Sequence, residues 1–197
     1  MYRRIYQPIM LSIPLILGSW FNFPAFAQII ESEQATLNAG KPLLTGQDGI
    51  YVGKILINAS VDKAWEVLTD YSHFPKFLPT ITSLKIIESK ANQKVYEQVN
   101  TVQVLFFSQS SKVTIAATET IPSLITFQLR SADSLKSLQG SWQIEPISAN
   151  QVLVTNQVNV EPSASTPRDI FFGIYSENLT KTLAALKQET ERRSQDK

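Results

Sequence analysis

The sequence contains no cysteine and a single histidine, His73, among its 197 residues. A chain without cysteine forms no disulfide, performs no thiol chemistry and builds no iron–sulfur or cysteine–zinc site. One histidine alone gives no metal-ligand spacing, so we expect neither a metal nor another cofactor. His73 stands near Asp70 and Ser72, but three neighbours in sequence do not make a catalytic triad. We therefore interpret His73 as a surface or helix-linking residue.

The chain also lacks an excess of charge of either sign. Its formal net charge is +1, and the part from Gln28 onward carries 16 basic and 17 acidic residues. This balance argues against nucleic acid as a partner, because phosphate binding depends on clustered positive charge. With 43% hydrophobic residues, the sequence predicts one domain of ordinary size with its own core.

The N-terminal 27 residues have the features of an export signal. Arg3 and Arg4 are followed by an apolar run over 9–23 and by Ala25-Phe26-Ala27, a small-any-small pattern for cleavage before Gln28. The run is shorter than the ~20 residues that a spanning helix needs, and prolines interrupt it. An uncleaved membrane anchor is the alternative. We predict a mature protein in the periplasm, the thylakoid lumen or the extracellular space.

The pattern after the signal predicts a strand and two short helices. Residues 28–48 are polar without clear periodicity and are interpreted as a linker or loosely packed lead-in. Residues 49–59 alternate as a strand does, and Ser60 is a suitable N-cap for a short helix. Two prolines limit residues 74–81 to at most a second short helix.

The middle of the chain then follows a period of two, which is typical of strands. Six such segments are predicted, at 83–89, 94–107, 109–121, 124–131, 137–147 and 151–160. The turns between them are short and polar, which favours hairpins and antiparallel neighbours.

The last segment, 165–193, predicts a long helix. Thr166 is a good N-cap, Pro167 suits the first helical position, and Asp169 favours the positive end of the helix dipole. The helix would be roughly 40 Å long at 1.5 Å per residue. Its predicted apolar stripe consists of Ile170, Phe171, Ile174, Tyr175, Leu179, Leu183 and Leu186. Such a helix needs a large apolar partner surface, which we expect the sheet to supply.

Two stretches of this sequence resemble the START-like, or SRPBCC, superfamily, in particular its polyketide cyclase/dehydrase and coenzyme Q-binding branch. They are residues 59–79, ASVDKAWEVLTDYSHFPKFLP, and residues 138–146, LQGSWQIEP. The resemblance implies an α+β helix-grip fold over residues 49–195, as in Bet v 1. A curved antiparallel sheet of about seven strands would wrap the long C-terminal helix, and two short helices would follow the first strand.

The resemblance further implies an elongated apolar cavity between sheet and helix. Independently, Ala116, Ala117, Gly140 and Gly173 are small residues that could leave space there. A fully packed interior is the alternative, since protein cores normally have few voids. A protein of this fold can be a carrier, an enzyme or a receptor, so fold alone does not decide function.

Several residues are candidates for contact with a ligand in that cavity. Asn156 shares a strand face with four valines and so would point inward as a polar contact, with a structural hydrogen bond as the alternative. Trp142 is expected on the inner face, where core packing and ligand contact are compatible. Phe127 and Ile174 complete the candidate apolar lining.

Charged candidates are less strongly indicated. Glu97 and Glu119 are in phase with apolar neighbours, and an inward carboxylate could act as an acid or base. Their positions near strand ends favour the alternative of solvated side chains. Arg130 and Lys136 flank a polar loop and could receive an anionic headgroup at the cavity mouth, or could simply be solvated.

The leading functional hypothesis is a non-catalytic carrier of a hydrophobic small molecule such as a lipid or quinone. A carrier of this kind would also contact a membrane transiently. The alternatives are an enzyme of the cyclase/dehydratase type acting on a hydrophobic chain, and a protein-interaction module with a closed cavity.

Overall fold

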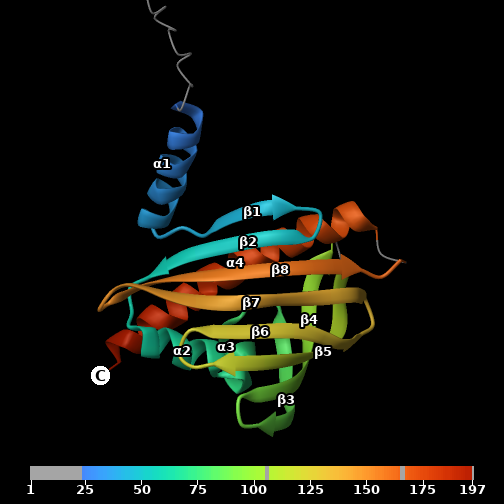
Figure 1. The fold of residues 1–197 in the computed structure, drawn as a ribbon. Helices are drawn as coiled ribbons and strands as arrows, with labels where there is room; N and C mark the ends of the chain where they lie inside the picture. The colour runs from blue at the N-terminus through green and yellow to red at the C-terminus, as the bar shows by residue number, and fades with distance from the viewer. Residues whose placement is uncertain (1–23, 105–106, 165–166, 197) are drawn as a thin grey trace, which may run out of the picture.

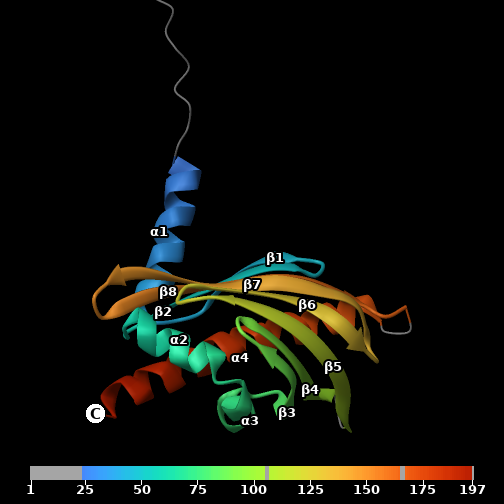
Figure 2. The same ribbon diagram turned by 60° about the horizontal axis from the view of Figure 1, so that its bottom comes forward.

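The computed structural model describes residues 24–104, 107–164 and 167–196. It consists of a curved antiparallel sheet with a long C-terminal helix beneath it (Figures 1 and 2). The helices are α1 (Pro24–Asn38), α2 (Val61–Thr69), η1 (Tyr71–His73), α3 (Phe74–Phe77) and α4 (Arg168–Gln195). The strands are β1 (Leu43–Gln47), β2 (Ile50–Ile57), β3 (Ile81–Lys90), β4 (Gln93–Val104), β5 (Phe107–Thr120), β6 (Leu124–Ala132), β7 (Leu135–Ser148) and β8 (Gln151–Pro162).

The predicted fold class is confirmed, with eight strands in place of about seven. The sheet order is β1-β2-β8-β7-β6-β5-β4-β3, and all neighbours are antiparallel. Strands β3 to β8 follow one another as hairpins, as their short polar turns predicted. The sheet bends strongly toward β3, so that its concave side encloses α2, α3 and α4 (Figure 2).

The additional strand comes from the segment predicted as a lead-in, residues 28–48, and that prediction is wrong. The segment contains most of α1 and all of β1, which pairs with β2. Between Pro24 and Gly40 no proline or glycine interrupts the chain, and Gly40 ends the helix region with φ +71°. Helix α1 stands away from the sheet on the side opposite α4 (Figure 2).

The predicted export signal and its alternative, an uncleaved membrane anchor, fall largely outside the described residues. The export signal covers 1–27, of which 1–23 are not described, and its predicted cleavage point before Gln28 lies within α1. Among the residues that the structure describes, no helix is long and apolar enough to cross a membrane. Export therefore stays a prediction.

Helix α2 forms as its sequence predicts. The Ser60 side chain accepts a hydrogen bond from the Lys63 backbone N–H at 3.3 Å, and Asp62 occupies the first turn. Both groups stabilise the start of the helix, where backbone N–H groups have no partner within the helix. Ala64, Val67 and Leu68 are buried on the face toward the sheet, which fixes where the chain continues into η1 and α3.

Helix α4 packs under β2 with part of the predicted stripe. Leu179, Leu183 and Leu186 are buried, whereas Ile170 is 56% exposed and Phe172 is buried in its place. The stripe differs at its start, where Phe172 lies close to Gly49, just before β2. Pro167 occupies the cap position without a side-chain hydrogen bond. The predicted cap, Thr166, lies outside the described residues.

The core lies where β2, β8 and α4 meet. Its fully buried side chains are Ile55, Ile57, Val152, Val154 and Leu183. Gly53 of β2 permits this contact, because a Cβ atom there would come within 2.7 Å of Leu183 Cδ1. Burial of branched apolar side chains at this density is the dominant stabilising contribution.

Most of the small residues expected to leave cavity space have other roles. A Cβ atom at Gly140 would lie 2.1 Å from the Gln157 carbonyl oxygen, so glycine there permits close strand approach. Gly173 is exposed with nothing near its Cβ position, and Ala116 lies on the outer face, since its neighbours Ile115 and Ala117 are buried. Only Ala117 fits the expectation.

Candidate functional site

A cavity of about 50 Å³ lies between the sheet, α4 and the segment Tyr71–Leu78. We call this segment, which comprises η1, α3 and Leu78, the lid. The cavity is lined by Leu68, Tyr71, Phe74, Leu78, Tyr96, Ile125, Phe127, Trp142, Thr182 and Leu186. This volume holds a few water molecules and is far below the ~300–1,000 Å³ of a typical small-molecule site. The space found here is therefore much smaller than the elongated cavity that the resemblance implies.

The lining is apolar and aromatic, with few polar atoms. No charged side chain contributes to it, and its polar groups are the hydroxyls of Tyr71, Tyr96 and Thr182 and the indole N–H of Trp142. The rings of Tyr71 and Tyr96 lie 5.0 Å apart, and that of Phe74 lies 5.3 Å from Tyr71. Such walls suit an apolar molecule with one or two hydrogen-bonding groups.

One carboxyl group lies immediately behind this lining. Tyr71 donates a hydrogen bond from its hydroxyl to Glu119 Oε1 at 3.0 Å. Glu119 is only 9% exposed and lies on the inner face of β5 beside Ile125, which lines the cavity. Burial, together with Tyr96 and Glu119, raises the pKa of the Tyr71 hydroxyl, and burial raises that of Tyr96. Both phenols therefore stay protonated at neutral pH and do not act as bases.

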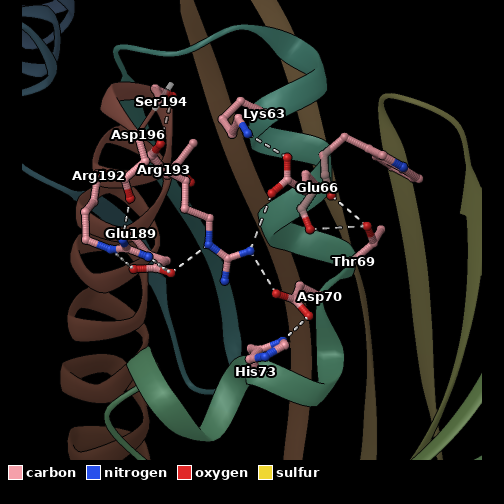
Figure 3. Close-up of polar contacts among 12 residues, drawn as sticks. Lys63, Glu66, Thr69, Asp70, His73, Glu189, Arg192, Arg193, Ser194 and Asp196 are labelled. Carbon is pink, nitrogen blue, oxygen red and sulfur yellow. Dashed lines mark hydrogen bonds and ion pairs between the residues drawn. The ribbon is translucent and has the colours of Figure 1, made fainter.

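The lid is fixed to α4 by a group of polar side chains that Figure 3 shows, which we call the lid clasp: Asp70, His73, Glu189 and Arg193. Arg193 Nη1 donates to Asp70 Oδ2 at 2.8 Å and Arg193 Nε donates to Glu189 Oε1 at 2.7 Å. His73 Nδ1 lies 2.6 Å from Asp70 Oδ1. The Arg193 guanidinium also lies over the Phe77 ring, 5.9 Å from its centroid.

The two carboxyl groups of the clasp have lowered pKa values. Burial alone would raise the pKa of Asp70, but hydrogen bonds from His73 and Arg193 outweigh it and hold the pKa below its ordinary value. A hydrogen bond from Arg192, opposed by burial and assisted by Arg193, lowers the pKa of Glu189 to about 2. Both carboxylates are thus preferentially ionised in the folded state. His73 links η1 to this cluster, as a helix-linking residue would.

Of the residues predicted for the site, Trp142 and Phe127 line the cavity. Glu119 points inward, although its place near a strand end favoured a solvated side chain. The end of β5 that carries Glu119 is covered by η1, whose Tyr71 bonds to it. The sequence pattern does not reveal this contact. These three residues are brought together by β5, β6 and β7.

Other predicted residues lie away from the cavity. Asn156 is buried, and its Nδ2 donates to the Ser141 carbonyl at 3.1 Å, which is the structural alternative. Ile174 is half-buried and does not line the cavity, and Arg130 is exposed. Lys136 forms an exposed ion pair with Glu161, with the nitrogen and oxygen 3.0 Å apart.

Glu97 does not face the cavity and has the solvated side chain that its place near a strand end favoured. Its neighbour Tyr96 is buried in the core, so Glu97 points to the outer face of β4, where Lys112 Nζ lies 3.4 Å from its Oε1. The sequence pattern selected Val95 and Val99 as the inner row because they are apolar. The inner face of β4 continues after Tyr96 with two polar residues, Gln98 and Asn100. Hydrophobicity alone therefore does not show which residues of β4 face inward.

Sequence reasoning missed Tyr96 and Thr182 as lining residues. Tyr96 is next to Glu97 in β4, and the alternation there did not single it out. Thr182 is a polar residue directly before Leu183 of the stripe. The only sequence signal that it faces the sheet is its spacing of four residues, about one helical turn, from Leu186. Leu186, the other lining residue of α4, belongs to the predicted apolar stripe.

Comparison with known proteins agrees with this geometry. The family model described as polyketide cyclase / dehydrase and lipid transport matches residues 57–187. The fold is that of the START-like helix-grip class, and the chain belongs to the polyketide cyclase / dehydrase and lipid transport family. A search of curated protein sequences finds no match.

Solved structures show the same fold at low sequence identity. The Zhui aromatase/cyclase from Streptomyces sp. R1128 is similar with a TM-score of 0.65 and 17% identity, over 72% of this chain and 93% of that one. A START superfamily protein from Mycobacterium smegmatis has a TM-score of 0.64 and 18% identity, over 75% and 99%. A STAR-related lipid transfer protein from Xanthomonas axonopodis has a TM-score of 0.57 and 18% identity, over 76% and 98%.

Proposed function

We propose that this protein is a carrier that binds a hydrophobic small molecule, such as a lipid or quinone, between the sheet and α4. The observation that supports this most strongly is the cavity lining, which is apolar and aromatic and contains no charged side chain. Protein interiors are normally packed without voids, so a space of this chemistry at the family's sheet–helix interface favours a binding role.

Binding requires the closed cavity to widen, and the lid is the element that would move. It supplies Tyr71, Phe74 and Leu78 to the lining. It is short, and the lid clasp connects it to α4 through Asp70 and Arg193. Displacement of the lid would expose the cavity without disturbing the core between β2, β8 and α4.

A cavity-filling substitution tests this proposal. Thr182 is half-buried on α4 and lines the cavity, so Thr182→Phe places a ring in the ligand space. Ala184, two residues along the same helix, is exposed, so Ala184→Phe is the matched control. Binding of the hydrocarbon fluorophore 1,6-diphenylhexatriene should weaken by at least ~tenfold in Thr182→Phe, which is ~1.4 kcal/mol. Equal binding by both variants would contradict the proposed site.

An enzyme of the cyclase/dehydratase type is the second candidate, and Glu119 is the observation that favours it. A buried carboxylate one hydrogen bond behind the cavity wall could exchange a proton with a substrate through Tyr71. Extraction of the bound molecule from the wild type and from Glu119→Gln distinguishes the two functions. A carrier would hold the same molecule in both, whereas an enzyme variant would accumulate a different one, its substrate.

We also propose that the protein is exported and contacts a membrane transiently when it loads or releases its ligand. The N-terminal arginines, apolar run and Ala25-Phe26-Ala27 support export. Mass spectrometry of the mature protein from its source should find Gln28 as the first residue. A retained N-terminus in a membrane fraction would support the anchor instead.

A further inference from the structure

The hydroxyl of Tyr96 is a polar group in the cavity wall without a protein partner. Tyr96 is 7% exposed and lines the cavity. Across residues 24–104, 107–164 and 167–196, no group forms a hydrogen bond with this hydroxyl. Every fully enclosed side-chain nitrogen or oxygen in the same ranges has a partner. Since the Tyr96 oxygen has no partner, it cannot be fully enclosed and must be in contact with open space. The cavity is the open space that Tyr96 lines.

Two polar groups near Tyr96, those of Tyr71 and Glu119, can accept hydrogen bonds. Tyr71 commits its hydroxyl proton to Glu119 Oε1 at 3.0 Å, which leaves the lone pairs of its oxygen. Among the described residues, Tyr71 is the one donor to the Glu119 carboxylate side chain. The ring of Tyr96 lies 5.0 Å from that of Tyr71, so a donor and these acceptors come from neighbouring side chains of the cavity wall.

From this arrangement we infer that Tyr96, Tyr71 and Glu119 select ligands that end in a hydroxyl group over matched ligands that end in a carboxylate. A hydroxyl can accept from Tyr96 and donate to the Tyr71 oxygen or to Glu119. A carboxylate can only accept, and its negative charge would lie near that of Glu119 in a poorly solvated place. The inference rests on the proposed function and adds the class of headgroup.

Competition between two ligands of equal chain length tests the inference. The full chain is loaded with 1,6-diphenylhexatriene, which has no polar group, and is titrated with 1-decanol or with decanoate at pH 8. We expect decanol to bind about tenfold more tightly, equivalent to ~1.4 kcal/mol. Glu119→Gln should tighten decanoate binding and reduce the ratio to about threefold or less, and Tyr96→Phe should weaken decanol binding by about tenfold.

Tyr175→Phe is the matched control, because Tyr175 is another tyrosine of raised pKa that does not line the cavity. It should keep the wild-type preference. Equal competition by decanol and decanoate in the wild type, or an unchanged ratio in Glu119→Gln, overturns the inference while the hydrocarbon still binds. Failure of the hydrocarbon itself to bind counts against the proposed function and the inference together. Glu119→Gln keeps the test decisive if Tyr96→Phe does not fold.

Discussion

The two halves of the concave face of this sheet have different contents. Under β2 and β8, branched aliphatic side chains such as Ile55 and Val154 are fully buried against α4. Under β4 to β7, the space is filled by aromatic side chains from the sheet and the lid, including Tyr96 and Trp142, and a cavity remains. The first half is dry and closely packed, and the second contains hydroxyl groups and unfilled volume.

Under the proposed function, this difference separates the part of the face that stabilises the fold from the part that would bind the ligand. Helix α4 is too narrow to cover a strongly curved sheet, so it packs under one half only. The other half is closed by short helices that pack Tyr71 and Phe74 into the core and are also bound to α4 through the lid clasp. A site can then open at the lid while the aliphatic half preserves the fold.

The largest effect should follow from a cavity made in the aliphatic half. Leu183 is 0% exposed, and Leu183→Ala should lower the free energy of unfolding by ~2–5 kcal/mol, since the space left cannot fully collapse. Thr182→Ala, at the adjacent residue in the cavity half, should change it by ~0.5 kcal/mol or less. Urea unfolding of both variants measures the contrast, and equal losses would remove the distinction between the halves.

A smaller loss is expected when the lid clasp is broken. Asp70→Ala leaves the partly buried Arg193 with Glu189 as its main partner and should cost ~1–3 kcal/mol, because a charged hydrogen bond is lost. It should also speed the uptake of a hydrocarbon by loosening the lid. Lys181→Gln is the control, since it breaks an exposed pair with Glu177 that contributes ~0.5 kcal/mol or less. Uptake at an unchanged rate would show that the lid is not the entrance.

The clasp should also make stability depend on acid. The pKa of Glu189 is about 2 in the folded protein against 4.5 ordinarily, so its stabilising contribution is complete above pH 4.5 and is lost as pH falls toward 2. Asp70, whose pKa is also lowered, acts in the same direction. Thermal unfolding should occur at a lower temperature at pH 3 than at pH 5. Glu189→Gln should show a smaller drop, and an equal drop would exclude this carboxylate as the cause.

The smallest effect is predicted at the exposed start of α4. Ile170 belonged to the apolar stripe expected from the sequence but is 56% exposed. Ile170→Ser should therefore change the free energy of unfolding by less than ~0.5 kcal/mol. A loss as large as that of Leu183→Ala would mean that this turn is covered after all.

The sequence predicted the aliphatic half better than the cavity half, and the reason is physical. Regular alternation in β2 and β8 and the spacing of Leu179, Leu183 and Leu186 directly reflect burial against one partner. In β4 the inner face meets a lid and then solvent, so hydrophobicity no longer reports orientation. Tyr96 was not predicted as a lining residue for that reason.

The candidate site was predicted only in part. Trp142 and Phe127 lie on strands whose alternation is regular, and both line the cavity. The partners of Glu119 and Asn156 depend on contacts with residues 48 and 15 positions away in the chain. No local pattern encodes such contacts, and the same holds for the lid clasp, where Asp70 meets Arg193 across 123 residues.

The most direct test of the account is native mass spectrometry of the full chain, gently purified from its source, alongside Thr182→Phe and Ala184→Phe produced in the same way. We predict an additional mass of a hydrophobic compound on the wild type and on Ala184→Phe, and its loss from Thr182→Phe. A protein that carries no such compound in any form, or one that Thr182→Phe retains in full, would contradict a binding site between the sheet and α4.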